Sequence, residues 1–88
     1  MVGGIIEDFC VLKHGSMNAE VKFLVLDDND YCTVKARIDN TAFKQIKKGQ
    51  SIWWHSPYVY LEINGVKDVK FTKIGASGGN KNSYYQIK

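Results

Sequence analysis

Four aromatic residues lie within eight positions of this chain, in the segment WWHSPYVY that runs from Trp53 to Tyr60. An exposed aromatic ring offers a flat face that stacks on other flat rings, and the electron-rich centre of that face attracts cations. Such chemistry requires rings that face solvent. The elements that carry the segment therefore decide how many of its four rings are available to a ligand.

Basic residues accompany these rings in the C-terminal part of the sequence. The net charge of +3 hides an uneven distribution. Residues 1 to 34 hold two basic and six acidic residues, a net charge of −4, whereas residues 35 to 88 hold ten basic and three acidic residues, a net charge of +7. Charge asymmetry of this kind indicates an anionic partner.

Flat rings and cations together predict a non-enzymatic face that binds single-stranded nucleic acid, either DNA or RNA, without strong sequence preference. Each base that stacks on an aromatic side chain contributes about 1 to 3 kcal/mol, and each phosphate neutralised by a cation makes binding more sensitive to salt. The candidate contacts are the rings of Tyr31, Trp53, Tyr58 and Tyr60 and the cations of Lys22, Lys35, Arg37, Lys70 and Lys73.

Short β-strands separated by turns must position these side chains. Apolar runs and alternation predict strands over residues 5–14, 20–26 and 31–38. The run DDND at residues 27–30 predicts the turn of a hairpin, because Asx side chains bond their own backbone in turns. Alternation gives the third strand an aromatic and basic outward face, made of Tyr31, Lys35 and Arg37.

One short helix is predicted after the third strand. Asp39 or Asn40 supplies the N-cap of residues 41–48, and Gly49 ends the helix. Cations near the end of a helix favour its dipole, which gives Lys47 and Lys48 a structural explanation that needs no ligand.

Three further strands are predicted after the helix, over residues 51–55, 58–63 and 66–74. Pro57 marks the turn between the first two, since proline cannot donate to a sheet ladder. Asn64-Gly65 is a strong signal for a hairpin between the last two.

Alternation divides the rings of the aromatic segment. Trp53 and Trp54 are adjacent and must point to opposite faces, so one is expected in the core and the other remains as a stacking platform. Tyr58 and Tyr60 share one outward face. Cross-strand aromatic pairs also stabilise sheets, which is the structural alternative to a binding role for these tyrosines.

Residues 1–74 are expected to form a single domain, followed by a tail at residues 75–88. The tail, GASGGNKNSYYQIK, is rich in Gly, Ser and Asn and is expected to be flexible at first. We expect its last residues to dock on the barrel as a final short strand, through Tyr84, Tyr85 and Ile87.

The order of three strands, a short helix and further strands resembles the OB-fold, a five-stranded Greek-key barrel. The likeness covers roughly residues 4 to 74 and includes the stretch AFKQIKKGQSIWW, where helix, glycine turn and strand follow one another. It implies a mainly β barrel of five to six strands with the helix between the third and fourth. It also implies a ligand face around the second and third strands, which implicates Lys22, Tyr31, Lys35 and Arg37. An SH3-like barrel is the alternative topology.

Signatures of catalysis or metal binding are lacking in the sequence. The two histidines, His14 and His55, have no Ser or Cys with an oriented base around them, as nucleophilic catalysis requires. The run DDND lacks the glycine and the distal glutamate of a calcium loop. Cys10 and Cys32 have no C-x-x-C spacing and are expected to be two core thiols. We therefore expect no enzyme activity, no metal and no cofactor.

Protein interaction is the alternative function. Leu24 and Leu26 face outward on the second strand and, with exposed Tyr and Trp, would form a partner or homodimer surface. Small β proteins of phages or mobile elements act as adaptors or inhibitors in this way. Salt distinguishes the two functions, because nucleic-acid binding weakens steeply with salt and an apolar interface does not.

A membrane-spanning segment is not expected. Apolar runs such as residues 23–26 are far shorter than the roughly 20 residues that a spanning helix needs. The start MVGGIIEDF lacks the basic-then-apolar order of a signal peptide, so we expect a cytoplasmic protein.

Overall fold

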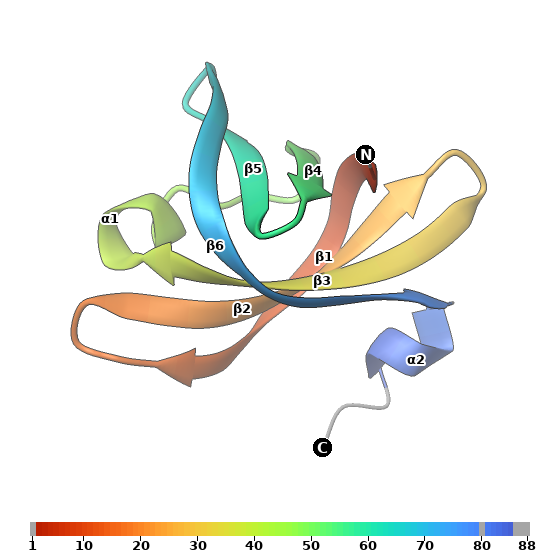
Figure 1. The fold of residues 1–88 in the computed structure, drawn as a ribbon, viewed down its shortest axis with the longest axis horizontal. Helices are drawn as coiled ribbons and strands as arrows, with labels where there is room; N and C mark the ends of the chain where they lie inside the picture. Colours follow the sequence, from red (N-terminus) through yellow and green to blue (C-terminus); the bar gives the residue numbers. More distant parts are fainter. Residues whose placement is uncertain (1, 80, 86–88) are drawn as a thin grey trace.

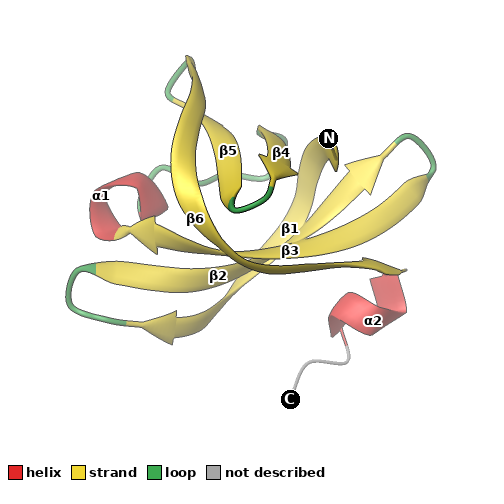
Figure 2. Cartoon of the chain, in the orientation of Figure 1, coloured by secondary structure: helices red, strands yellow, loops and turns green. Residues whose placement is uncertain are grey.

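Six β-strands form a closed barrel in the computed structural model, which describes residues 2–79 and 81–85 (Figure 1). The order of neighbouring strands is β1-β2-β3-β6-β5-β4, and β4 pairs back with β1. One short helix separates β3 from β4 and another follows β6 (Figure 2). The elements are β1 (Val2–His14), β2 (Asn18–Asp27), β3 (Asp30–Asp39), α1 (Asn40–Phe43), β4 (Ser51–His55), β5 (Tyr58–Ile63), β6 (Val66–Gly79) and α2 (Lys81–Tyr85).

This architecture confirms the predicted fold class, a mainly β barrel with one short helix between the third and fourth strands. All six neighbouring strand pairs are antiparallel. The barrel closes where Val2–Ile5 of β1 pair with β4, while Ile5–His14 of the same strand pair with β2. A side chain on Gly3 would overlap Trp53 and one on Gly4 would overlap the backbone of Leu26, so the close approach of these strands requires glycine.

Two predicted hairpins have the turn geometry that their sequences favour. Asn64 and Gly65, between β5 and β6, have φ angles of 51° and 80°. Asp28, in the turn between β2 and β3, has a φ of 56°. Gly, Asn and Asp adopt this left-handed region at lower cost than other residues, so local sequence and tertiary pairing agree at both turns.

The barrel interior holds the apolar residues that alternation assigns to it. Trp54 is 5% exposed and belongs to this core, whereas Trp53 is half-buried on the outside, which confirms the predicted division of the two rings. Cys10 and Cys32 are free thiols and only partly buried. The core cluster comprises Ile6, Ala19, Val21, Phe23, Val25, Val34, Ala36, Ile38, Ala42, Ile46, Ile52, Trp54, Val59, Leu61, Ile63 and Phe71.

The predicted helix at residues 41–48 is wrong in its length, because α1 ends at Phe43. The predicted cap is correct, since the Asp39 carboxylate accepts from the Ala42 amide at 2.9 Å. Beyond α1 the backbone turns to meet β1, where the Gly49 amide donates to the Ile6 carbonyl at 2.8 Å and the Ile6 amide donates to the Gln50 carbonyl at 2.9 Å. Pairing with β1 thus overrides the local helix propensity of this segment.

The tail begins as the end of β6 and then forms α2. Residues 75–79 are not a loop but continue β6 along β3, from the pair Gly75 and Lys35 to the pair Gly79 and Tyr31. Tyr84 and Tyr85 lie in a helix instead of a last strand, and Ile87 lies outside the described residues. The length of β3 explains the first difference, because its backbone offers partners that composition alone does not reveal.

Phe23→Ala is expected to lower the free energy of unfolding by about 3 to 5 kcal/mol, because it leaves a cavity at a fully buried core position. Urea unfolding followed by tryptophan fluorescence measures this change. Val11→Ala is the control, since Val11 is 43% exposed on β1 and its loss should change stability by less than about 0.5 kcal/mol. Equal effects of the two substitutions would contradict the assigned core.

Candidate nucleic-acid interface

Four of the predicted contact residues meet on the outer face of β4, β5 and β6. In the register of these strands Trp53 lies opposite Tyr60, and Tyr60 lies opposite Lys70. The rings of Trp53 and Tyr60 stack with centroids 4.0 Å apart and planes 14° from parallel. Tyr58 meets Tyr60 edge to face at 6.4 Å, and the Lys70 ammonium lies 4.4 Å from the centroid of the Tyr58 ring. We call Trp53, Tyr58, Tyr60 and Lys70 the aromatic cluster.

A hydrogen bond fixes the position of Trp53 in this cluster. Its indole N–H donates to a carboxylate oxygen of Asp68 at 2.7 Å. Asp68 has a φ of 60° beside a register shift between β5 and β6, so the strand is locally irregular where it supplies this acceptor. Bulges commonly re-aim a side chain in this way. The sequence does not reveal Asp68 as a partner of Trp53.

The rings are only partly available to a ligand. Trp53 and Tyr60 are both half-buried, and each covers one face of the other, so at most one face of each ring is left for stacking. Tyr58 is 36% exposed and is the most accessible of the three. Tyr60 therefore has the structural role expected of a cross-strand aromatic pair, which is to stabilise the sheet.

Three further cations lie along β3 and β2. Arg37 pairs with Thr72 of β6, which pairs with Tyr58, so a single row across the sheet joins this arginine to the aromatic cluster. Lys35 lies two residues further along β3, directly opposite Lys22 of β2. We call Arg37, Lys35 and Lys22 the basic strip. Arg37 also contacts Glu20 at 3.4 Å.

Two predicted contacts lie away from the aromatic cluster. Lys73 pairs with the buried Ala36, which places it on the opposite side of β6 from Lys70. Tyr31 lies at the start of β3, beyond Lys35. The sequence could have predicted that Lys70 and Lys73 lie on opposite sides of β6. They are three residues apart, and no register shift falls between them.

Closure of the barrel limits what a ligand can touch at once. In a closed ring of six strands each strand faces about 60° away from its neighbour on average, so outer faces two or more strands apart point in different directions. The aromatic cluster and Arg37 lie on four consecutive strands, β4, β5, β6 and β3. Arg37, on β3, already lies two strands round from Tyr58, and Lys22, on β2, lies one strand further, so a ligand must follow the curved surface to reach either of them.

Carboxylates border the aromatic cluster on one side. A cavity of about 220 Å³ beside Trp53 is lined by Ser51, Leu61, Glu62, Lys67 and Asp68. Two carboxylates disfavour a phosphate there, since like charges repel at close range. The Lys70 and Arg37 side of the cluster is consequently the side on which an anionic backbone would lie.

Helix α2 covers the outer face of β1, β2 and β3, where Lys22 and Tyr31 project. The Lys22 ammonium lies 5.7 Å from the centroid of the Tyr84 ring, and the Lys81 ammonium lies 5.1 Å from that of Tyr31. Tyr84 is 2% exposed. Leu24, on this same outer face, is fully buried without belonging to the interior core. The predicted exposure of Leu24 is therefore wrong, because the helix of the same chain lies over this face.

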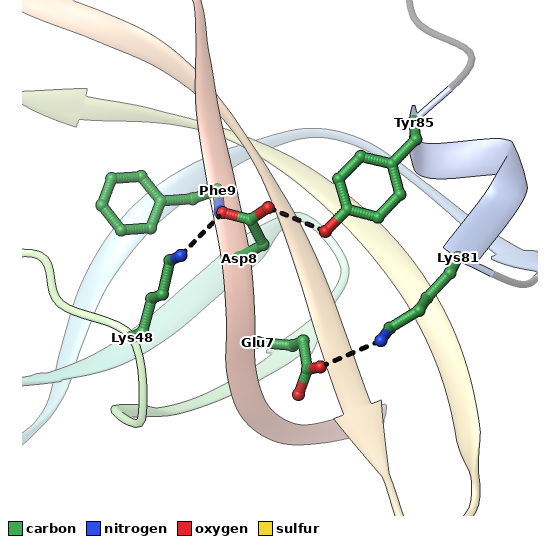
Figure 3. Close-up of polar contacts among 6 residues, drawn as sticks. All are labelled: Glu7, Asp8, Phe9, Lys48, Lys81 and Tyr85. Carbon is green, nitrogen blue, oxygen red and sulfur yellow. Dashed lines mark hydrogen bonds and ion pairs between the residues drawn. The ribbon is translucent and has the colours of Figure 1, made fainter.

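Polar contacts hold α2 against β1, as Figure 3 shows. The Tyr85 hydroxyl donates to Asp8 at 2.9 Å, and the Lys81 ammonium lies 3.3 Å from Glu7. Lys48 approaches Asp8 from the other side at 3.6 Å. Desolvation opposes ionisation of Asp8, but the hydrogen bonds from Tyr85 and the Phe9 amide, together with the Lys48 charge, outweigh it and lower the pKa of Asp8.

Both tyrosines of α2 resist ionisation. Burial raises the pKa of Tyr84, and the neighbouring Cys10 thiol adds to the effect. The hydrogen bond to the Asp8 carboxylate raises the pKa of Tyr85. In each case the neutral hydroxyl is the form that the docked helix favours.

No arrangement typical of a metal site occurs among the described residues, where three or more His, Cys, Asp or Glu side chains never gather. His14 lies 3.2 Å from the Asn40 side chain and packs edge to face on Phe43. His55 is exposed at the turn between β4 and β5. Neither α1 nor α2 is long and apolar enough to cross a membrane.

Comparison of the chain with models of protein families, with curated proteins and with solved structures finds no match. Function must therefore be inferred from the geometry of the barrel.

Docking of α2 is expected to weaken above about pH 10. Both tyrosine pKa values are raised in the docked state, so their contribution is fully present below the ordinary tyrosine pKa of about 10 and is lost as pH rises through the raised values. Cα and Cβ carbon NMR signals of residues 81–85, which do not exchange with water, report this transition when followed from pH 8 to pH 12.

The double variant Tyr84→Phe/Tyr85→Phe is the matched control, because it keeps both rings and removes both ionisable hydroxyls. The side chains of Lys22, Lys48 and Lys81, which also contact this region, are present in both proteins. An identical loss of docking in wild type and control would show that the two tyrosine hydroxyls do not cause the transition, and would contradict the prediction.

Proposed function

We propose that this barrel is a non-enzymatic module that binds single-stranded nucleic acid on the outer face of β4, β5, β6 and β3. The observation that carries the proposal is the order of side chains across these strands. Aromatic rings occupy β4 and β5, and cations follow on β6 and β3. A single strand that runs along this boundary would lay its bases over the rings and its phosphates against Lys70 and Arg37.

The chemistry of the face favours binding without sequence preference. Stacking on rings accepts any base, because every base has a flat π face. Reading of sequence requires hydrogen-bonding groups directed at base edges. Asp68, the carboxylate nearest to Trp53, already accepts the indole N–H. Tyr58 and Lys70 instead offer a ring and a cation, whose contributions depend little on the identity of the base.

Architecture adds support of a more general kind. A small closed barrel with one helix between its third and fourth strands is consistent with an OB-like domain, the resemblance drawn from the order of elements. In that family ligands commonly bind around the second and third strands. Here the exposed rings lie on β4 and β5, and the basic strip connects them to β3 and β2.

Tyr58→Ala is expected to weaken the binding of a fluorescein-labelled oligo-dT about 5- to 150-fold at low salt, the equivalent of about 1 to 3 kcal/mol for one lost stacking platform. Fluorescence anisotropy measures the dissociation constant. Tyr58→Phe is the matched control and should bind like wild type, because it keeps the ring. Failure of wild type to bind oligo-dT at micromolar protein would overturn the proposed function.

Intrinsic fluorescence gives an independent reading of the same titration. Trp53 faces the proposed ligand and Trp54 lies in the core, so quenching by oligo-dT should come from Trp53. Trp53→Phe keeps a ring at this place and should retain binding by anisotropy while losing the quenching. Quenching that persists in this variant would place the ligand elsewhere.

Lys70→Ala and Arg37→Ala are each expected to reduce the slope of log Kd against log salt by about 0.7, the value for one phosphate contact on a single strand. Lys44→Ala is the matched control, because Lys44 is exposed just beyond α1 and lies on none of the strands that carry the proposed interface. Unchanged slopes in both site variants would show that neither cation contacts phosphate.

A second candidate function, protein interaction, draws on a different observation. Val11, Leu12 and Met17 are 43%, 40% and 79% exposed, and all three belong to the hairpin of β1 and β2. This hairpin is a more accessible apolar surface than the predicted pair Leu24 and Leu26, since Leu24 is buried and Leu26 half-buried. A partner or a second copy bound there would be insensitive to salt, and light scattering would detect a dimer.

A further inference from the structure

Helix α2 is attached to the barrel by contacts that a ligand is able to replace. It has five residues, too few for a helix that is stable by itself in water. Tyr85 and Lys81, which bond Asp8 and Glu7 of β1, are exposed side chains, and exposed contacts of this kind contribute little. Burial of Tyr84 is thus the main contact that holds the helix in place.

Two side chains that face α2 are suited to a nucleic-acid strand. The Lys22 ammonium meets the ring of Tyr84, and the ring of Tyr31 meets the ammonium of Lys81. A nucleotide offers a phosphate to a lysine and a base to a tyrosine ring. The helix therefore occupies a cation and an aromatic platform of the kind that the exposed interface uses.

A cavity over β2, β3 and β6 shares Lys22 with the covered area and Lys35 with the exposed part of the basic strip. It has a volume of about 220 Å³ and is lined by Lys22, Thr33, Lys35, Gly75, Ala76 and Ser77. Lys22 and Lys35 lie directly opposite each other, and like charges in such a pair are unfavourable. Within the described part of the chain neither forms an ion pair with a carboxylate. A phosphate between the two ammonium groups would relieve their repulsion.

We propose that the outer face of β2 and β3 beneath α2 is a second, masked part of the interface, and that a long single strand displaces α2 to reach it. This inference rests on the proposed function. The strand runs from the aromatic cluster past Arg37 to Lys35 and then takes up Lys22 and Tyr31, the two side chains that α2 holds. A short strand is confined to the aromatic cluster and Arg37 and leaves α2 docked.

Tyr84→Ala separates the helix from the barrel and leaves the interior core unchanged, since Tyr84 is not part of that core. The variant is expected to bind a labelled oligo-dT of about 20 nucleotides roughly tenfold more tightly than wild type, which corresponds to a helix that is docked in about nine molecules of ten. Its affinity for an oligo-dT of about four nucleotides should equal that of wild type. Circular dichroism and urea unfolding verify that the barrel is folded.

A second variant keeps the buried ring and weakens the docked state by other means. Lys81→Ala/Tyr85→Phe removes the ion pair to Glu7 and the hydrogen bond to Asp8 and should produce a smaller increase in affinity for the long strand. In wild type, saturating long oligo-dT should speed hydrogen exchange of the amides at residues 81–85, whereas the short oligonucleotide should leave it unchanged.

The outcomes separate this inference from the proposed function. Equal or weaker binding of the long strand by Tyr84→Ala, or slower exchange in α2 on binding, would show that the helix is a bystander or a part of the interface, and would overturn the masking alone. If wild type and Tyr84→Ala both fail to bind either oligonucleotide, the proposed function is overturned and the masking with it.

Discussion

The pairing of the first residues of β1 with β4 is the constraint on which the rest of the barrel depends. It closes the sheet, so each side chain must point either into one shared interior or to the outside. Gly3 and Gly4 permit the close approach, since a Cβ at either position would overlap Trp53 or the backbone of Leu26. With the register fixed there, Trp54 enters the core and Trp53 remains outside beside Tyr60. A slip of one residue would exchange the two tryptophans and leave the outer face without its stacked pair.

The uneven distribution of charge along the sequence supplies the ion pairs that join its two parts in the folded barrel. All three ion pairs among the described residues join an acidic residue of the first 34 positions to a basic residue of the later ones, Glu20 to Arg37, Asp8 to Lys48 and Glu7 to Lys81. Part of the basic surplus therefore balances the acidic strands of the same barrel. Within the described chain Lys35 and Lys70 take part in none of these pairs, and Lys70 lies on the ring of Tyr58. The charge available to an anionic partner is consequently smaller than +7 but lies close to the rings.

Strand alternation and turn chemistry made most of the barrel predictable, since the division of the two adjacent tryptophans between core and surface and the turns at residues 27–30 and 64–65 follow from local sequence. Alternation alone did not decide which of the two tryptophans is buried. The sequence failed where distant pairing decides. The helix after Asp39 ends early because Gly49 and Gln50 must bond Ile6, and the glycine-rich segment extends β6 because β3 offers it a partner. The cover over Leu24 was equally hidden, since it depends on a helix some 60 positions away. In the candidate site, alternation predicted that Tyr58, Tyr60 and one of the two tryptophans face outward. It did not reveal that this tryptophan is Trp53 or that α2 covers Lys22 and Tyr31.

The aromatic cluster can both stabilise the sheet and bind a ligand, because side chains already ordered by packing lose less rotamer entropy on binding. A side chain that must be immobilised by its ligand loses rotamer entropy on binding, and this loss opposes affinity. Here the ring of Trp53 is fixed in advance by its stacking on Tyr60 and by the hydrogen bond to Asp68, and Lys70 already lies over Tyr58. A base that stacks on this cluster would meet rings that the barrel has ordered for its own stability. The same packing leaves only one face of Trp53 and Tyr60 uncovered, so preorganisation is obtained at the expense of contact area, and Tyr58 becomes the platform on which affinity depends most.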